Sequence, residues 1–208
     1  MKTTFLILLV LVNQMLNFKL AFAELKNDSH VSNIKSCYVL IQNEDEKIIQ
    51  LAHKVFNKWQ AKAKTKKVII VDFSKAMEQK RLFIIHLDSG KIILRSKVCH
   101  GIGSGEKSKP SVFSNEPNSK MSSLGVMLTA ETFISKRWGY SMRIDGLQNR
   151  NSNVRLRAIT FHDCTKLSTP WSWGCFSTPH EINDKLINLT KNGTLIFAFS
   201  NQNNMNDF

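Results

Sequence analysis

The sequence predicts a mainly β domain that carries two helices. Short apolar runs recur between residues 67 and 199, and stretches rich in glycine, asparagine and serine separate them. Residues 44–64 and the segment before Gly193 instead carry apolar residues at helical spacing. Hydrophobic residues make up 42% and charged residues 22% of the 208 residues, which is the balance of one folded globular domain.

The first 23 residues have the features of a secretory signal peptide. Lys2 supplies the positive start, 5–12 form an apolar core, and Ala21-Phe22-Ala23 is a small-x-small cleavage site. A membrane anchor is the alternative, but Asn13 and Lys19 interrupt the apolar run well short of the ~20 residues that a span needs. We therefore expect export and no stable membrane span after cleavage.

The charge of the chain favours an anionic partner. The formal net charge is +13, and cleavage after residue 23 would remove Lys2 and Lys19 and leave +11. A charge of this size favours an anionic cell envelope or nucleic acid. The basic residues are dispersed, apart from the run at 62–67, and are not interleaved with aromatic residues. We therefore do not expect nucleic acid as a partner.

Residues 24–66 are expected to form a polar leader and one amphipathic helix. Residues 24–43 are polar with weak periodicity, and the helix is predicted at 44–64. Its apolar stripe consists of Ile48, Leu51, Ala52, Val55, Phe56 and Trp59. This stripe indicates a packing face; a membrane-binding face is the alternative, because the opposite face is basic.

Residues 67–208 are expected to form the β domain. The predicted strands are 68–73, 81–87, 91–94, 124–128, 140–144, 156–161 and 195–199. Asp88-Ser89-Gly90 predicts a hairpin between the second and third strands, because Asp and Gly favour tight turns. The stretch 101–122 is rich in Gly, Ser, Lys and Pro, which predicts a long loop that is functional or mobile.

The second helix has a well-marked start. Thr178-Pro179-His180-Glu181 puts Thr at the N-cap, Pro at the first helical position and Glu at the third, the pattern of a capping box. Apolar residues then continue at helical spacing toward Gly193. Cys175 would lie just before this helix, where backbone N–H groups and the helix dipole favour negative charge.

Cys175 and His162 are the residues best suited to chemistry. Cys175 lies in the turn Ser172-Trp173-Gly174-Cys175, and His162 ends an apolar strand. A cysteine nucleophile acts as the thiolate, so it needs a histidine or a positive potential to lower its pKa. Gly174 permits a sharp turn, and the N–H groups around Cys175 could then face a developing oxyanion.

A zinc site is the rival chemical interpretation. Suitable ligand types occur at Cys99, His100, His162, Cys164, Cys175 and His180. No pair has the usual spacing of paired cysteine ligands, although His162 and Cys164 would point the same way on an extended segment. Export also permits one disulfide among Cys37, Cys99 and Cys164, and the sequence does not choose the pair.

Eight stretches in order resemble the murein L,D-transpeptidase catalytic domain family, in its Ser-Trp-Gly-Cys variant. They are Val71-Asp-Phe-Ser-Lys75, Arg81-Leu-Phe-Ile-Ile85, His100-Gly-Ile-Gly-Ser-Gly105, Phe113-Ser-Asn115, Ser119-Lys-Met-Ser-Ser-Leu-Gly125, Gly139-Tyr-Ser-Met-Arg-Ile-Asp-Gly-Leu147, Arg157-Ala-Ile-Thr-Phe-His162 and Ser172-Trp-Gly-Cys175. Together they cover about residues 67–199. The resemblance implies a β-sandwich-like or barrel-like catalytic fold for 67–208, with a helix before it and one helix after the cysteine.

The resemblance also implies a role for five residues. Cys175 matches the nucleophile and His162 the base that activates it. The family orients this base through the backbone carbonyl of the next residue, which here is Asp163 in place of the usual small residue. The extra carboxylate of Asp163 could also hold the imidazole charged. Gly174 and the Cys175 N–H match the oxyanion region, and Ser172 takes the Ser/Thr position of the motif.

Four further residues are expected to contact substrate. His100, Ser122, Ser123 and Trp173 would line the cleft, and hydrogen bonding within the β core is the alternative for His100 and the two serines. After the cysteine, Phe176-Ser-Thr replaces the family's usual residues.

The resemblance implies an exported cysteine L,D-transpeptidase of the periplasm or cell envelope that needs no metal and no other cofactor. Its partners would be peptidoglycan stem tetrapeptides, whose terminal D-Ala is released through a thioester that an amine resolves by cross-linking or exchange. With water as the acceptor it would be an L,D-carboxypeptidase. A non-catalytic wall-binding module with the same fold and a secreted metal-binding protein are the alternatives from other classes.

Overall fold

The computed structural model describes residues 29–105, 108–165, 170–201 and 206–208, with side chains from residue 43 onward. The predicted signal peptide lies outside the described residues, and so does the side chain of Cys37. The chain divides into two compact units, Met1–Glu46 and Lys47–Phe208. The second unit holds all the strands. No helix in the described part of the chain has the length and apolarity that crossing a bilayer requires.

The N-terminal helix α2 extends over Ser29–Trp59. It begins well before the predicted start at residue 44, because residues 24–43 contain no glycine or proline to stop a helix, although they lack an apolar stripe. Within the second unit, five residues of the stripe are buried: Ile48, Leu51, Ala52, Val55 and Phe56. The stripe is therefore a packing face of this unit, as the sequence predicted.

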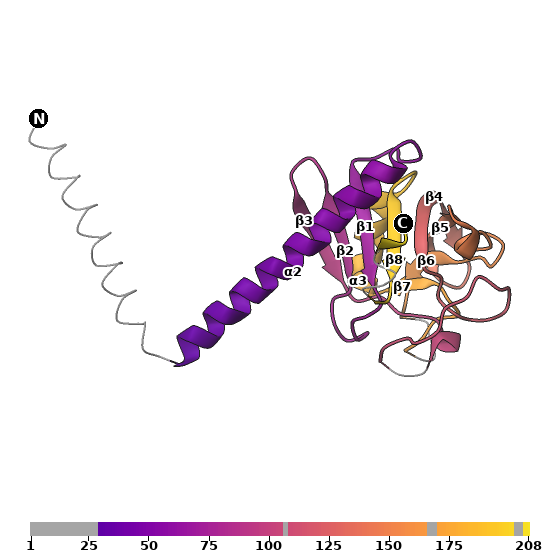
Figure 1. Cartoon of the computed structure of the whole chain (residues 1–208). Helices are drawn as coiled ribbons and strands as arrows, with labels where there is room; N and C mark the ends of the chain where they lie inside the picture. Colours follow the sequence, from indigo (N-terminus) through magenta and orange to yellow (C-terminus); the bar gives the residue numbers. More distant parts are fainter. Residues whose placement is uncertain (1–28, 106–107, 166–169, 202–205) are drawn as a thin grey trace, which may run out of the picture. The chain divides into compact units, whose positions relative to one another are not determined.

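Eight strands form one sheet in the order β3-β2-β1-β8-β4-β5-β6-β7 (Figure 1). Their bounds are β1 Lys67–Asp72, β2 Leu82–His86, β3 Lys91–Ser96, β4 Gly125–Ser135, β5 Gly139–Gly146, β6 Thr160–Asp163, β7 Phe176–Thr178 and β8 Leu195–Phe199. Neighbours pair antiparallel except β1 with β8 and β6 with β7, which are parallel. Helix α3, His180–Thr190, follows β7.

The central strands are buried on both faces, which explains their continuous apolar sequences. In β1, Ile69 and Val71 pack into one core that includes Leu186 and Ile187 of α3. Val68 and Ile70 point the other way, into a second core that contains the apolar stripe of α2. One helix therefore covers each face of the sheet. The fold class is confirmed: mainly β, with an N-terminal helix and one helix after Cys175.

The structure corrects two predictions near the cysteine. The predicted strand 156–161 begins only at Thr160, because 150–158 form 3-10 and turn structure in which Leu156 is 74% exposed. The predicted capping box is wrong: α3 begins at His180 with Pro179 as its N-cap and no side-chain cap. Thr178 instead ends β7, so this strand separates Cys175 from the helix N-terminus. The helix dipole therefore does not act directly on the thiol.

Candidate active site

His162 lies in β6, and Cys175 directly precedes β7, the strand that pairs with β6 in parallel. In the β6–β7 register His162 is opposite Ser177, and Phe161 is opposite Phe176. Because side chains alternate along a strand, Thr160 and His162 share a face with Cys175 and Ser177. The usual spacing between strands and the rise per residue put the Cα atoms of Cys175 and His162 about 8 Å apart, as diagonal neighbours.

The thiol of Cys175 is held by Thr160 and by the turn before β6. The hydroxyl of Thr160 donates to Sγ at 3.8 Å, and the thiol donates to the carbonyl of Ala158 at 3.7 Å. Burial raises the pKa of Cys175, against hydrogen bonds from Thr160 and the positive charge of Arg157, which lower it. The thiol is therefore protonated at neutral pH in this structure, so it needs a base before it can attack.

The imidazole of His162 is neutral and held at both nitrogens. Nδ1 lies 2.7 Å from the carbonyl oxygen of Asp163, and Nε2 lies 3.0 Å from Oγ of Ser177. A carbonyl only accepts hydrogen bonds, so Nδ1 carries the proton and Nε2 accepts from the Ser177 hydroxyl. Burial lowers the pKa of His162. The indole of Trp138 stacks on the ring at 4.4 Å between centroids.

The backbone of Asp163 faces the base, but its carboxylate does not. The carboxylate accepts hydrogen bonds from Nδ1 of His180 and from the Thr165 N–H. The negative charge of Asp163 does raise the pKa of His162, but burial outweighs it and the net shift is downward. Against the expectation from the sequence, Asp163 therefore does not hold the imidazole charged.

Gly174 and Ser172 shape the turn that precedes the cysteine. Gly174 has φ 109°, a left-handed conformation that favours glycine, and an added Cβ would lie 2.6 Å from the carbonyl oxygen of Met121. The hydroxyl of Ser172 accepts from the Gly174 N–H at 3.1 Å and donates to the Cys175 carbonyl at 2.7 Å. The Gly174 N–H is therefore engaged in this conformation and does not point to an oxyanion.

Three of the four predicted substrate-binding residues are buried and bonded within the protein. His100 accepts from Arg81 at Nδ1 and donates to the carbonyl of Gly105 at Nε2. The hydroxyl of Ser122 accepts from the Gly101 N–H, and that of Ser123 donates to the Ser114 carbonyl. These contacts match the alternative that the sequence left open, hydrogen bonding within the core.

Trp173 differs from those three because it is 67% exposed. Its indole lies in the turn that leads to Cys175, and the ammonium group of Lys120 lies 4.8 Å from the ring centroid. Substrate contact at Trp173 remains a prediction that its exposure favours.

The sequence did not identify Arg157, which fastens a loop beside the thiol. Its guanidinium donates to the carbonyls of Ser114 and Met121 and to the hydroxyls of Ser119 and Ser123. These four bonds hold 114–123, the last part of the predicted long loop, against the turn that contains Gly174. Arg157 therefore brings a positive charge close to Cys175 and stabilises the wall next to it.

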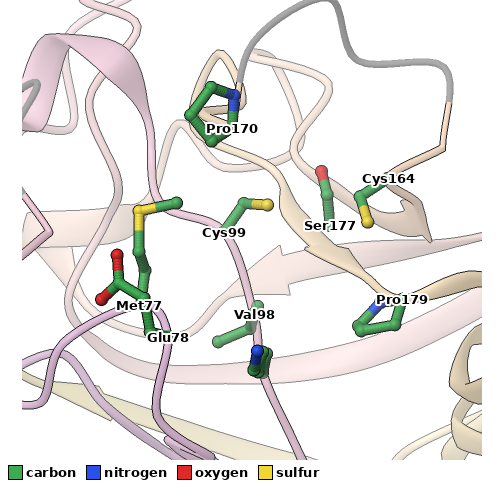
Figure 2. A pocket seen from close by; sticks show the side chains of 9 residues that line it. Met77, Glu78, Val98, Cys99, Cys164, Pro170, Ser177 and Pro179 are labelled. Carbon is green, nitrogen blue, oxygen red and sulfur yellow. The ribbon is translucent and has the colours of Figure 1, made fainter.

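A pocket of about 260 Å³ lies next to Ser177 (Figure 2). Its lining residues are Met77, Glu78, Lys97, Val98, Cys99, Cys164, Pro170, Ser177 and Pro179. Cys99, Cys164 and Cys175 are free thiols. Burial raises the pKa of Cys99 to about 12 and also raises that of Cys164. Burial raises the pKa of Cys175 as well, so what distinguishes Cys175 is its contact with Thr160 of β6 and the nearby charge of Arg157.

The ligand types that suggested zinc are dispersed in the fold. Among the residues described, no three or more His, Cys, Asp or Glu side chains come together in a group that could hold a metal ion. His162 and His100 use both ring nitrogens in hydrogen bonds within the protein.

Comparison with solved structures gives similar proteins at low identity. An L,D-transpeptidase from Stackebrandtia nassauensis is 19% identical, with 67% of this chain and 58% of that chain covered and a TM-score of 0.42. Bd1075 of Bdellovibrio bacteriovorus is 15% identical, with 69% of this chain and 52% of that chain covered and a TM-score of 0.44. A mutant of the helical cell shape determining protein Pgp2 from Campylobacter jejuni is 10% identical, with 67% of this chain and 49% of that chain covered and a TM-score of 0.49. The chain thus matches about half to three-fifths of each.

No curated protein matches the chain. The model of one protein family, described as the L,D-transpeptidase catalytic domain, does match, over residues 41–199. This match covers most of the chain, including α2 from residue 41 onward, all eight described strands, α3 and the turn that carries Cys175. The chain therefore belongs to the L,D-transpeptidase catalytic domain family.

Proposed function

We propose that this protein is an exported cysteine L,D-transpeptidase that acts on peptidoglycan stem tetrapeptides. Cys175 attacks the carbonyl between the third residue and the terminal D-Ala, and D-Ala leaves as a thioester forms. An amine of a neighbouring stem then resolves the thioester to a cross-link, or a free D-amino acid exchanges with the D-Ala. If water is the acceptor, the same site acts as an L,D-carboxypeptidase.

One observation carries this proposal within the family: the thiol of Cys175, directly before β7, lies on the same face as the neutral imidazole of His162 in β6. His162 is fixed by Asp163 with Nε2 as its basic nitrogen, which is the state that a general base requires. Cys175 lies diagonally across from it, protonated and next to the positive charge of Arg157. Both groups thus begin in the protonation state from which one proton transfer produces the reactive pair.

The proposed reaction uses His162 twice. Nε2 first takes the proton from Sγ of Cys175, which creates the thiolate next to an imidazolium and leaves Nδ1–H bonded to the Asp163 carbonyl. After the attack, the imidazolium gives this proton to the leaving amine of D-Ala. The side chains of Cys175 and His162 have no direct hydrogen bond in the described structure. The transfer therefore requires rotation of the thiol away from Ala158 and of the Ser177 hydroxyl away from Nε2.

Export and location in the periplasm or cell envelope belong to the same proposal. The features of residues 1–23 support a signal peptide. The formal net charge of the full chain is +13, of which +11 would remain after cleavage, and this supports retention near an anionic wall. The Lys120 ammonium beside the exposed Trp173 places one such positive charge next to the turn that leads to Cys175.

Intact mass spectrometry of the purified protein with a disaccharide-tetrapeptide tests the proposal. We expect an adduct on Cys175 with the mass of the stem minus D-Ala, and none in Cys175→Ala. Cys164→Ser is the matched control and should acylate like the wild type. If the wild type forms no adduct, or if Cys175→Ala still releases D-Ala, the enzyme proposal is wrong. If the adduct does form, analysis of the products with and without an added amine distinguishes a transpeptidase from a carboxypeptidase.

A non-catalytic wall-binding module is the second candidate, and one observation favours it. Nε2 of His162 is occupied by Ser177, while the buried thiol of Cys175 has a raised pKa. A protein of this kind would bind muropeptides with equal affinity in the wild type and in Cys175→Ala, and neither would form an adduct. Binding measured by calorimetry, together with the mass assay, distinguishes the two candidates.

A further inference from the structure

Ser177 is the direct hydrogen-bond partner of the candidate base. Its hydroxyl lies 3.0 Å from Nε2 of His162, and its side chain has no exposed surface. The register of β6 and β7 puts the two residues directly opposite each other. Because Nδ1 must donate to the Asp163 carbonyl, Nε2 is an acceptor and the Ser177 hydroxyl is the donor.

The backbone fixes the position of this hydroxyl. Ser177 lies in the middle of β7, and its carbonyl accepts from the Cys99 N–H at 2.8 Å. On the other side of the same strand, the Cys164 N–H donates to the carbonyl of Thr178 at 2.9 Å. The strand is therefore held from both edges, so Oγ cannot leave the imidazole by a shift of the main chain.

Several other groups act on the charge of His162. Asp163 stabilises the imidazolium and Arg137 destabilises it. The guanidinium of Arg137 lies 4.5 Å from the ring centroid of Trp138, the residue that stacks on His162. The Asp163 carboxylate is itself shared with the exposed His180. The thiols of Cys164 and Cys175 are also near this strand pair, but the hydrogen bond to Nε2 itself comes from Ser177.

We propose that Ser177 is a positioning residue that holds the general base in both of its protonation states. A hydroxyl can donate to Nε2 of the neutral ring and, after rotation about the C–O bond, accept from the Nε2–H of the imidazolium. Nε2 has a single lone pair, so the Ser177 hydroxyl leaves it while the thiol proton is taken up and while that proton passes to the leaving amine. Between these two transfers Ser177 holds the ring, as a donor to the neutral form and as an acceptor from the imidazolium. This inference rests on the proposed function and assigns a role to a position where the chain departs from the family's usual residues.

The Ser177 hydroxyl matters more for the charged ring than for the neutral one. Hydrogen bonds to charged groups contribute about twice as much as those between neutral groups. The pocket next to Ser177 is walled largely by apolar side chains, among them Met77, Val98 and Pro179, so a replacement water would find few partners there. Loss of the hydroxyl should therefore disfavour the buried imidazolium.

Ser177→Ala and Ser177→Thr test this role. We expect the alanine variant to lower the pKa of His162 further, measured by NMR of labelled histidine, and to slow acylation of Cys175 at pH 7 by about 10- to 100-fold. The KM for the stem peptide should change little, because Ser177 has no exposed surface. The threonine variant keeps the hydroxyl, so it should restore both the pKa and the acylation rate to within a few-fold of the wild type.

The proposal is overturned if Ser177→Ala leaves the His162 pKa and the acylation rate unchanged, or if Ser177→Thr is as slow as alanine while folded. The histidine NMR of the wild type provides a test that needs no variant: a proton on Nε2 rather than Nδ1 contradicts the proposed bond. These spectra do not depend on turnover. A wild type that never acylates therefore defeats the proposed function, while the NMR still reports on Ser177 and His162.

Discussion

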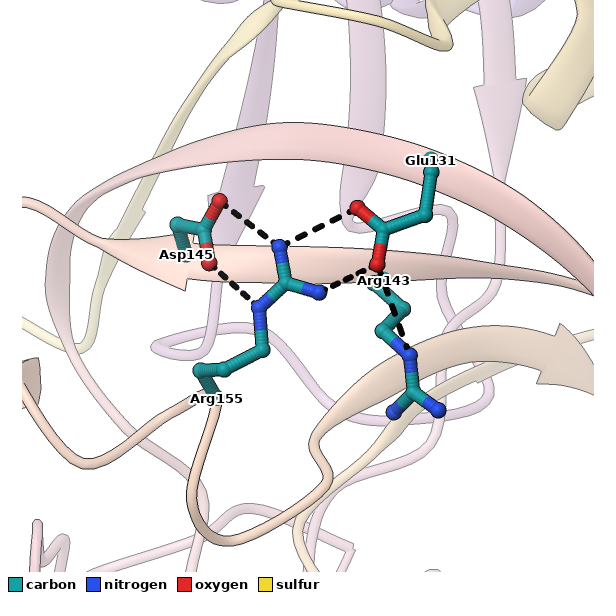
Figure 3. Close-up of polar contacts among 4 residues, drawn as sticks. All are labelled: Glu131, Arg143, Asp145 and Arg155. Carbon is teal, nitrogen blue, oxygen red and sulfur yellow. Dashed lines mark hydrogen bonds and ion pairs between the residues drawn. The ribbon is translucent and has the colours of Figure 1, made fainter.

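Two polar clusters on neighbouring strands show how burial changes what hydrogen-bonded side chains do. The site cluster consists of Thr160 and His162 on β6, Ser177 on β7, and Cys175 directly before β7. The arginine cluster consists of Glu131, Arg143, Asp145 and Arg155 on β4, β5 and the following turn (Figure 3). Both are joined by side-chain contacts across the sheet. In the site cluster His162 is 2% exposed, whereas the side chain of Arg155 is 40% exposed.

The difference lies in which state burial favours. In the site cluster, burial favours the neutral forms, since it raises the pKa of Cys175 and lowers that of His162. In the arginine cluster, hydrogen bonds from Arg155 lower the pKa of Glu131, so ionised partners are favoured. Buried polar groups thus become poised for proton transfer, while exposed ones stay charged and contribute mainly to local stability.

Removal of the base should have the largest effect. We expect His162→Ala to slow acylation of Cys175 at neutral pH by about 10²- to 10⁴-fold, because general-base catalysis contributes about that much. His180→Ala is the matched control, since His180 is the exposed histidine that bonds the same Asp163. It should acylate within a few-fold of the wild type. If both variants lost the same fraction of the acylation rate, the position of His162 on the face shared with Cys175 would not explain catalysis.

The pH dependence sharpens the same comparison. The pKa of His162 lies below the usual 6.5, so the base is lost only when the pH falls through that lower value. Acylation should therefore persist at pH 6.5 and decline below it. For the same reason the unfolded state binds more protons than the native state in this range, and the free energy of unfolding should decrease as the pH falls below 6.5. An acylation rate already halved above pH 7 would contradict the buried neutral base.

The turn before the nucleophile should show the next largest effect. Gly174→Ala combines a positive φ with a Cβ placed 2.6 Å from the Met121 carbonyl, and such strain costs about 1–3 kcal/mol of unfolding free energy. Gly90→Ala is the matched control, because Gly90 has φ 59° but an added Cβ there meets nothing within 4 Å. Chemical denaturation of both variants isolates the cost of the contact with the Met121 carbonyl. If Gly174→Ala were no less stable than Gly90→Ala, this turn would not be closely packed.

The sequence predicted the strands far better than the contacts within the site. The strands β1, β2 and β8 are continuous apolar runs, because both faces of the sheet are buried, and such runs are visible without any partner. The strand β7 has only three residues, Phe176–Thr178, too few for any alternation to be detected. Because β7 was not predicted, Thr178 resembled a helix N-cap. No pattern in the sequence indicated the contact of Ser177 with His162.

The chemistry-bearing residues were visible and their partners were not. A cysteine in a glycine turn and a histidine at the end of an apolar run suggest a nucleophile and a base by residue type alone. The carboxylate of Asp163 could have served either His162 or His180, which lie 1 and 17 positions away in the chain. Only the arrangement of β6 and α3 decides in favour of His180. Partner choice depends on register, which a single sequence specifies weakly at short strands.

The smallest effect is expected in the arginine cluster, and a buried arginine provides its contrast. Arg155→Gln breaks exposed pairs with Asp145 and Glu131, so we expect it to lower the free energy of unfolding by about 1 kcal/mol or less, and by still less at 1 M salt. Arg81 has no exposed surface and donates to the carbonyls of Val98 and Lys75 as well as to His100.

Arg81→Gln would leave several of these buried acceptors without a donor, at about 1–3 kcal/mol each. Urea denaturation of the two variants at low and high salt therefore compares the same substitution in an exposed and a buried site. We expect a larger loss for Arg81→Gln that salt does not reduce, because screening does not reach buried groups. Similar losses for both variants, equally reduced by salt, would mean that burial does not separate the two kinds of polar cluster in this fold.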